Sequence, residues 1–125
     1  MRYLGVDYGE KRIGLALSDA QGHLAFPHAT VGRIEDIFTL IQEEDIGTIV
    51  VGLPLSLEQE ETAESRAVRA FARRLGESVL LPIVFESEIF TTKIAEAHSP
   101  RSSADASAAA IILQAYLDKK MENRK

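Results

Sequence analysis

The chain contains 125 residues with a formal net charge of −5; 46% of the residues are hydrophobic and 26% are charged. This size and balance are typical of one globular domain that buries roughly two-thirds of its unfolded surface. The absence of cysteine excludes disulfides, thiolate zinc sites, iron–sulfur clusters and a cysteine nucleophile. The acidic total excludes a strongly basic nucleic-acid binder on average charge, although it leaves room for a local basic patch.

The organisation of the chain predicts one domain. Residues 1–120 should form it, and residues 121–125 should be a frayed tail. The first residues carry Arg2, Asp7 and Glu10, which interrupt the apolar stretch that a signal peptide requires. No apolar run approaches the roughly 18 residues of a membrane span. We therefore expect a cytoplasmic protein that does not associate with membranes.

The first third of the chain predicts three strands joined by short turns. Residues 2–8 are apolar apart from their ends, and residues 12–18 alternate large and small side chains with the period of two that strands show. Residues 24–31 give a third strand, and Pro27 places it at a sheet edge because proline cannot donate to the ladder. Together these strands predict an antiparallel meander.

The period then changes to that of helices separated by apolar strands. Residues 34–44 have helical spacing, and residues 48–53 are a continuous apolar run that indicates a strand buried on both faces. A second helix should use Ala63, Ala67, Phe71 and Leu75 as its buried face and end at Gly76.

The last part of the chain predicts a fifth strand and a long final helix. The strand should span residues 79–85, one or two helical turns should fall in residues 91–97, and the final helix should run to about Lys120. Either Ser103 or Asp105 should cap that helix, which would bury Ala106, Ala110, Leu113 and Leu117. The fold class is thus α/β: a mixed five-stranded sheet, antiparallel meander followed by αβαβα, with helices on both faces. The first, fourth and fifth strands should be parallel neighbours.

Acidic residues fall where such sheets place their sites, outside the carboxyl ends of the strands. Asp7 ends the first strand, Glu86 and Glu88 follow the fifth, and Asp105 opens the last helix. Carboxylates in this arrangement suit Mg²⁺, and two such ions can clamp the attacking and leaving oxygens of a phosphodiester cleavage. Each acid also has an ordinary structural interpretation: a turn residue for Asp7, a helix cap for Asp105 and solvated loop charges for the two glutamates.

Basic residues gather at two places that could receive phosphates. Gly9, Lys11 and Arg12 form the turn after Asp7, where backbone N–H groups and positive charge could cradle a phosphate. From spacing alone, a plain hairpin with solvated Lys11 and Arg12 explains this turn better. On the second helix Arg66, Arg69 and Arg73 share one face and could follow a phosphate backbone, unless they are only solvated.

Several motifs resemble the YqgF family, also called RuvX, over almost the whole chain. The longest is YLGVDYGEKRIGLALSD at residues 3–19. It is followed by VVGLPL at residues 50–55, the pair Thr91 and Thr92, and the final helix from Asp105 through residues 108–109 to residues 112–117.

The resemblance implies an RNase H-like fold and a nuclease that uses Mg²⁺ or Mn²⁺. Family members are regarded as nucleases that trim the 5′ end of pre-16S ribosomal RNA, and also as Holliday-junction resolvases. The family's catalytic, metal-binding acids fall on Asp7, Glu88 and Asp105. The aspartate and arginine that usually flank the glutamate are Ser87 and Ile89 here, so Glu86 could serve as an auxiliary carboxylate.

Three other functions stay open at this level. Resolution of four-way DNA would need two active sites and hence a homodimer. A nucleotide-binding ATPase would share the fold but normally needs a second domain to close over the nucleotide. A non-catalytic nucleic-acid-binding module is also possible, although clustered acids without a cation cost stability.

Overall fold

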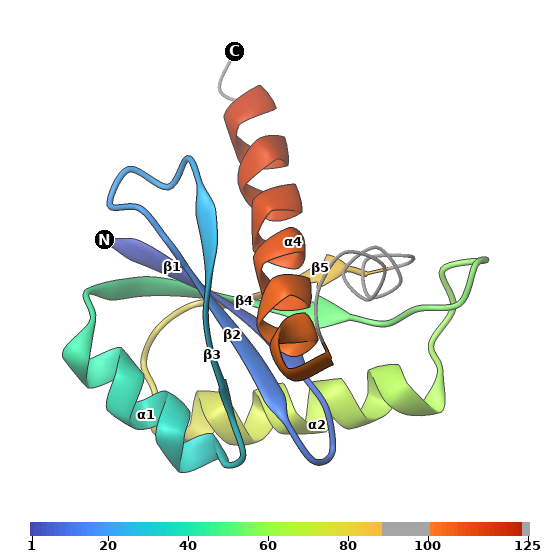
Figure 1. Ribbon diagram of the computed structural model, residues 1–125. Helices are drawn as coiled ribbons and strands as arrows, with labels where there is room; N and C mark the ends of the chain where they lie inside the picture. The colour runs from blue at the N-terminus through green and yellow to red at the C-terminus, as the bar shows by residue number, and fades with distance from the viewer. Residues whose placement is uncertain (89–100, 124–125) are drawn as a thin grey trace.

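The computed structural model describes residues 1–88 and 101–123, without the side chains of residues 101–104. It shows a sheet with helices packed on it (Figure 1). The strands are β1 (Arg2–Tyr8), β2 (Ile13–Ser18), β3 (Ala25–Val31), β4 (Ile46–Leu53) and β5 (Ile83–Ser87), and the helices are α1 (Ile34–Glu43), α2 (Ala63–Ser78) and α4 (Arg101–Glu122). The predicted turns at 91–97, with Thr91, Thr92 and Ile89, lie outside the described residues. No helix in the described parts is long and apolar enough to cross a membrane.

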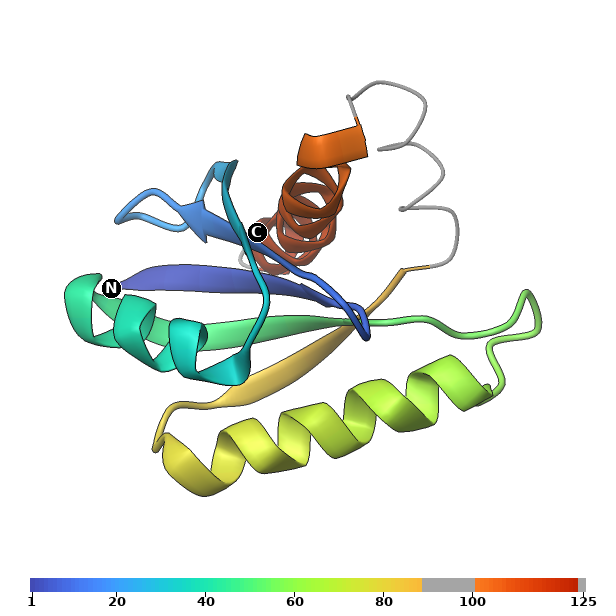
Figure 2. The ribbon, with the colours of Figure 1, turned by 60° about the horizontal axis from the view of Figure 1, so that its bottom comes forward.

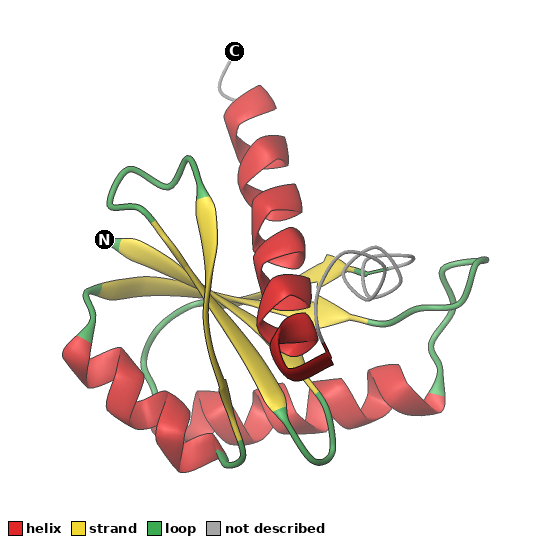
Figure 3. Cartoon of the chain, in the orientation of Figure 1, coloured by secondary structure: helices red, strands yellow, loops and turns green. Residues whose placement is uncertain are grey.

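The sheet has the predicted mixed topology, with strand order β3-β2-β1-β4-β5. The first three strands pair antiparallel as a meander, and β4 and β5 follow β1 in parallel. The strand that carries Pro27 is an edge strand, as predicted. Figure 3 shows the strands fanning out in one twisted sheet. The parallel strands therefore bring their carboxyl ends to one edge.

Helices cover both faces of the sheet, which confirms the predicted layers (Figure 2). Helices α1 and α2 lie on one face, where they bury the large apolar side chains of β1, β2 and β4. Of the helices in the described ranges, α4 is the one on the other face. Successive side chains of β1 point to opposite faces of the sheet. Leu4 and Val6 belong to the core under α1 and α2, whereas Tyr3 packs in the core under α4.

Small residues let α4 lie very close to the sheet. A Cβ atom added at Gly5 would stand 2.8 Å from Leu113 Cβ, and one added at Gly14 would stand 1.9 Å from the Asp105 carbonyl oxygen. The side of α4 that faces the sheet carries alanines, of which Ala109 is fully buried. This close approach fixes the height of α4 above β1 and β2.

Helix α2 differs from the prediction in its end and in its buried face. It passes through Gly76, whose added Cβ would meet only Ile83 Cδ1 at 3.5 Å, and ends at Ser78. Ala63 and Ala67 are exposed; the buried residues are Ser65, Val68, Phe71, Ala72 and Leu75. A mid-helix glycine costs only about 1 kcal/mol, which tertiary packing overrides here.

The last two elements are displaced from their predicted positions. Strand β5 begins at Ile83 rather than at residue 79, because the Pro82 carbonyl accepts the first bond from Ile49 N–H while proline itself donates none. Helix α4 begins at Arg101, so Asp105 lies inside it and is not its N-cap. At the other end α4 runs to Glu122, past the predicted end at Lys120.

Candidate active site

Asp7 projects from the carboxyl end of β1 toward α4. Its neighbours Val6 and Tyr8 belong to the core on the opposite face, so alternation directs the Asp7 side chain to the α4 side of the sheet. Its partner in the antiparallel register is Gly14 on β2. Because glycine has no side chain, the space beside the Asp7 carboxylate is open to the backbone of α4.

Glu88 stands directly beyond the end of β5. Its N–H donates to the Leu53 carbonyl at 3.1 Å, which extends the β4–β5 pairing by one step and fixes its backbone. The carboxyl group turns back over β4, where an added Cβ at Gly52 would stand 2.9 Å from Glu88 Oε2. Gly52 thus leaves the room in which this carboxyl group lies.

Asp105 comes to the same place from the first turns of α4. The helix backbone at Asp105 lies directly over Gly14, the register partner of Asp7. Asp105 Oδ2 stands 3.3 Å from Arg12 Nε in the β1–β2 turn, an ion pair that lacks hydrogen-bond geometry. The three acids predicted from the sequence therefore gather from β1, β5 and α4.

Electrostatics at this cluster favour protons on the carboxyl groups. Burial raises the pKa of Asp7 from 3.8 to about 6; its hydrogen bond with Glu88 opposes this rise, and the Asp105 charge adds to it. Burial, followed by the Asp7 charge and the Asp7 hydrogen bond, raises the pKa of Glu88 from 4.5 to about 8. Among the described residues, Glu88 Oε2 and Asp105 Oδ2 are buried without a hydrogen-bond partner. Buried carboxylate oxygens without hydrogen bonds are costly, and a bound cation would offset that cost.

Stability should therefore fall as pH rises through this cluster's titration. Both pKa values are higher in the folded protein, so the folded state binds more protons than the unfolded chain between about pH 4 and pH 8. Because each unit of pKa shift corresponds to about 1.4 kcal/mol, we expect the free energy of unfolding to drop by at least about 2 kcal/mol across that window. Urea denaturation at a series of pH values, without added metal, measures it.

A matched variant isolates the cluster in that experiment. Asp7→Asn removes one interacting charge and should flatten the pH dependence. Glu61, whose pKa Arg69 holds at about 2, titrates below the window and does not contribute to it. If the stability of the unmodified protein stays level or rises between pH 5 and pH 8, the result would contradict the burial of the Asp7 and Glu88 carboxyl groups.

Glu86, predicted as an auxiliary carboxylate, has a different partner. It lies within β5, is 6% exposed and accepts a hydrogen bond from Lys119 on α4. Lys119 is 14 residues from Asp105, or about 21 Å along the helix. The buried Glu86 charge is thus already compensated, and its ion pair ties β5 to the C-terminal half of α4.

The predicted phosphate-binding residues fall into two groups. Gly9, Lys11 and Arg12 lie in the β1–β2 turn beside the acids, and an added Cβ at Gly9 would stand 2.7 Å from the Arg12 carbonyl oxygen. The face with Arg66, Arg69 and Arg73 belongs to α2, on the other side of the sheet. Their role in substrate binding stays a prediction.

Arg69 is further constrained by two contacts. It donates two hydrogen bonds to the Glu61 carboxylate, at 2.8 and 2.9 Å, and its guanidinium lies 5.1 Å from the Phe85 ring centroid. A phosphate would have to compete with both contacts. Arg69 therefore contributes to the attachment of α2 to β5 in the protein as it stands.

Sequence reasoning missed the glycines that make the site possible. Gly14 and Gly52 admit Asp105 and Glu88, respectively, to within contact of the sheet. A glycine inside a strand often marks a close approach of another backbone or group, which is the signal that could have identified them. The ion pair of Arg12 with Asp105 had no such signal, because the two lie far apart in the chain.

Comparison with known proteins shows the family to which this chain belongs. The model of the family described as "RuvX: Holliday junction resolvase" matches residues 1–119. The chain belongs to the RuvX family. The resemblance inferred from the sequence motifs is thereby confirmed.

Curated relatives of this RuvX chain match over nearly their full length. A protein of Syntrophus aciditrophicus is 41% identical, over 94% of this chain and 89% of its own. One of Anaeromyxobacter sp. strain Fw109-5 is 39% identical, over 94% and 97%. Both are named "Putative pre-16S rRNA nuclease".

Solved structures confirm the RNase H-like fold. Thermus thermophilus RuvC in complex with a Holliday junction superposes with a TM-score of 0.58 at 18% identity, covering 97% of this chain and 96% of RuvC. A ROK family protein from Streptococcus pneumoniae, in complex with sucrose, gives 0.52 at 16% identity, but the match spans only 39% of that longer chain. At these identities the likeness concerns the fold alone.

Proposed function

We propose that this RuvX protein is a divalent-metal-dependent endonuclease that acts in the 5′-end processing of pre-16S rRNA. The observation that carries the proposal is the cluster of Asp7, Glu88 and Asp105, with two buried carboxylate oxygens that have no hydrogen-bond partner among the described residues. The names of the full-length relatives supply the substrate. Ribosomal RNA processing would place the protein in the cytoplasm.

The residues present fit a hard divalent cation such as Mg²⁺ or Mn²⁺. All three side chains offer oxygen ligands, which these ions prefer, and they commonly bind through a few carboxylates together with substrate phosphates. In the described ranges no group of three acidic, histidine or cysteine side chains could hold a metal ion in its present arrangement. The raised pKa values of Asp7 and Glu88 favour a proton on this pair, and we propose that one ion, or two with substrate bound, replaces it.

Each residue of the cluster has a distinct part in this reaction. Asp7 and Asp105 would hold the cation, and Glu88 would complete the set or orient the attacking water. The bound ion would supply Lewis-acid stabilisation and a water of lowered pKa. Arg12, next to Asp105, is placed to bind the phosphate once the cation balances the carboxylate charge. Lys11 and the Gly9 turn would hold the adjoining phosphate.

Resolution of four-way DNA junctions is the second candidate, favoured by the family's description. It would require two copies of this site facing two strands, and hence a homodimer. The same acids would perform the hydrolysis. The two candidates therefore differ in substrate and assembly rather than in chemistry.

The other two functions have less support. A nucleotide-binding ATPase is the weaker because the ROK protein with this fold has more than twice the length that matches here. A non-catalytic binding module would leave the buried oxygens of Glu88 and Asp105 without a purpose.

Cleavage assays at fixed ionic strength test the proposal. The substrates are a pre-16S RNA leader, a four-way DNA junction and plain duplexes of each nucleic acid, each with Mg²⁺, Mn²⁺ or EDTA. We expect metal-dependent cutting of the leader at discrete positions, with no cutting in EDTA. Metal-dependent cutting of the junction alone would select the resolvase, and cutting of neither, with binding retained, would overturn the nuclease assignment.

A further inference from the structure

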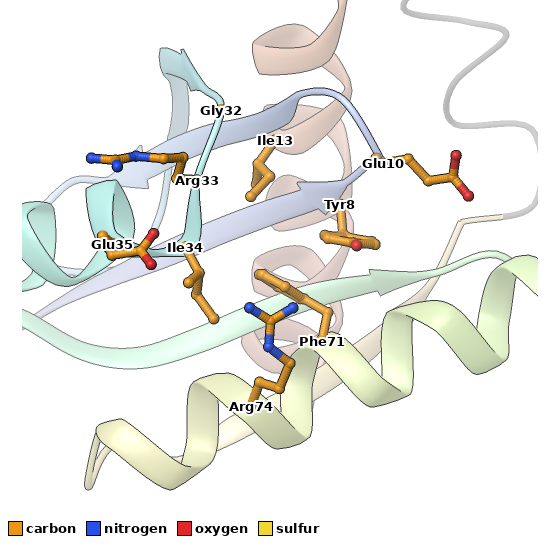
Figure 4. Close-up of a pocket in the computed structure, with 10 residues that line it drawn as sticks. Tyr8, Glu10, Ile13, Gly32, Arg33, Ile34, Glu35, Phe71 and Arg74 are labelled. Atoms are coloured by element: carbon orange, nitrogen blue, oxygen red, sulfur yellow. The ribbon is translucent and has the colours of Figure 1, made fainter.

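A second pocket opens on the face of β1 opposite the acids. It lies between β1, the start of α1 and the middle of α2, with a volume of about 330 Å³, at the lower end of the range of ligand pockets (Figure 4). Tyr8, the residue after Asp7, lines it. The pocket and the acid cluster are thus reached from the two faces of the same strand end, around the β1–β2 turn.

The floor of this pocket is a stacked pair of aromatic rings, of which Phe71 is buried and Tyr8 is partly exposed. The rings of Tyr8 and Phe71 stack with centroids 4.4 Å apart. Ile13 and Ile34 line the adjoining walls, as Figure 4 shows. Flat apolar surfaces of this kind receive unpaired nucleobases without regard to sequence, because every base has a π-face.

One cation points into the pocket. The Arg74 side chain rises from α2 toward the space between Ile34 and Tyr8, whereas the Glu10 side chain points away from it (Figure 4). Among the described residues, Arg74 has no carboxylate within ion-pair distance. An unpaired guanidinium beside an aromatic floor suits a phosphate joined to a base.

The remaining polar groups fit the same ligand. Glu35 and Arg33, at the start of α1, also line the pocket, and the Arg33 side chain points outward from it (Figure 4). A carboxylate accepts hydrogen bonds from the amino groups of bases, and a rim arginine can meet the next phosphate. The combination of aromatic floor, inward arginine and rim carboxylate matches a nucleotide better than it matches a bare anion.

We propose that this pocket holds an unpaired nucleotide of the nucleic-acid strand, one that flanks the bond presented to Asp7, Glu88 and Asp105. The inference rests on the proposed nuclease function for its substrate. It adds a requirement for single-stranded nucleic acid beside the cut. A fully paired duplex cannot place a base against Tyr8, so the pocket would direct the enzyme to ends, bulges and loops.

Two cations on opposite faces of the sheet provide a matched test. Arg74 on α2 lines the pocket, whereas Lys120 lies in the last turn of α4 and does not line it. We expect Arg74→Gln to weaken binding of a labelled single-stranded oligoribonucleotide about tenfold, and Lys120→Gln to weaken it less than threefold. Fluorescence anisotropy in metal-free buffer of fixed ionic strength measures both, with a blunt duplex and free AMP as further ligands.

Each result decides the proposal. A larger loss for Arg74→Gln, limited to the single strand, supports it. Equal losses for the two variants would show a general charge effect and overturn it, as would Arg74-dependent binding of AMP without any effect on the strand. Because binding is measured without metal or cleavage, failure of the pocket and failure of the nuclease assignment remain distinguishable.

Discussion

Replacement of Asp7 by asparagine is expected to lower cleavage of the preferred substrate by about a thousandfold, while nucleic-acid binding stays within about twofold. Asp7 interacts with both of the other acids, and after burial its charge is the next cause of the raised pKa of Glu88. The amide keeps the shape of the side chain but removes one anionic ligand. The loss should therefore appear in turnover and not in the affinity for the strand.

Two measurements complete this prediction. Added Mg²⁺ should raise the melting temperature of the unmodified protein and leave that of Asp7→Asn nearly unchanged, because only a ligand that binds the folded state stabilises it. Thermal denaturation at a series of Mg²⁺ concentrations measures this. Asp45→Asn is the control: it removes an exposed charge just before β4, at the opposite edge of the sheet. A variant at Asp7 that cleaves at the normal rate would rule out this site.

Gly14→Ala should damage both the fold and the site. The added Cβ would stand 1.9 Å from the Asp105 carbonyl oxygen and 2.9 Å from Ala106 N. These atoms are helix backbone, so the whole first part of α4 would have to move. Overpacking of this kind costs about 3 kcal/mol. Displacement of Asp105 should also lower cleavage at least about a hundredfold, since misplacement by about 1 Å can cost that much.

Gly76→Ala is the matched control for that substitution. Its added Cβ would meet only Ile83 Cδ1 at 3.5 Å, an ordinary contact within α2, so stability should stay level or rise. Urea denaturation and the cleavage assay, run well below the melting temperature, measure both variants. Normal stability and activity in the Gly14 variant would mean that α4 does not lie against β2 as described.

Part of the candidate site could be predicted because strands and sheets follow local rules. A charged residue at the end of an apolar strand, such as Asp7, indicates a functional role. The parallel order of β1, β4 and β5 places Asp7 and Glu88 at one edge of the sheet. The position of Asp105 could not be derived in the same way. Its residue type suits a helix cap, and only the start of α4 at Arg101 shows that it lies within the helix.

The partners of the charged residues depend on contacts between distant parts of the chain. Glu86 and Lys119 are separated by 33 positions, and nothing local distinguishes Glu86 from the neighbouring Glu88. Packing of α4 across β5 decides that the first is paired with a lysine and the second is left with an unpartnered oxygen. The same packing pairs Arg12 with Asp105.

The sequence by itself determined the order of strands and helices, the α/β class, the edge position of β3 and the family, because periodicity, proline and motifs are local properties. The tertiary structure alone decided how close α4 lies to the sheet, which acids are buried and which arginines are free. The position of α4 and the burial of the Glu88 carboxyl group depend on the absence of a side chain at Gly14 and Gly52. What a missing side chain permits is visible only when the opposing backbone is in place.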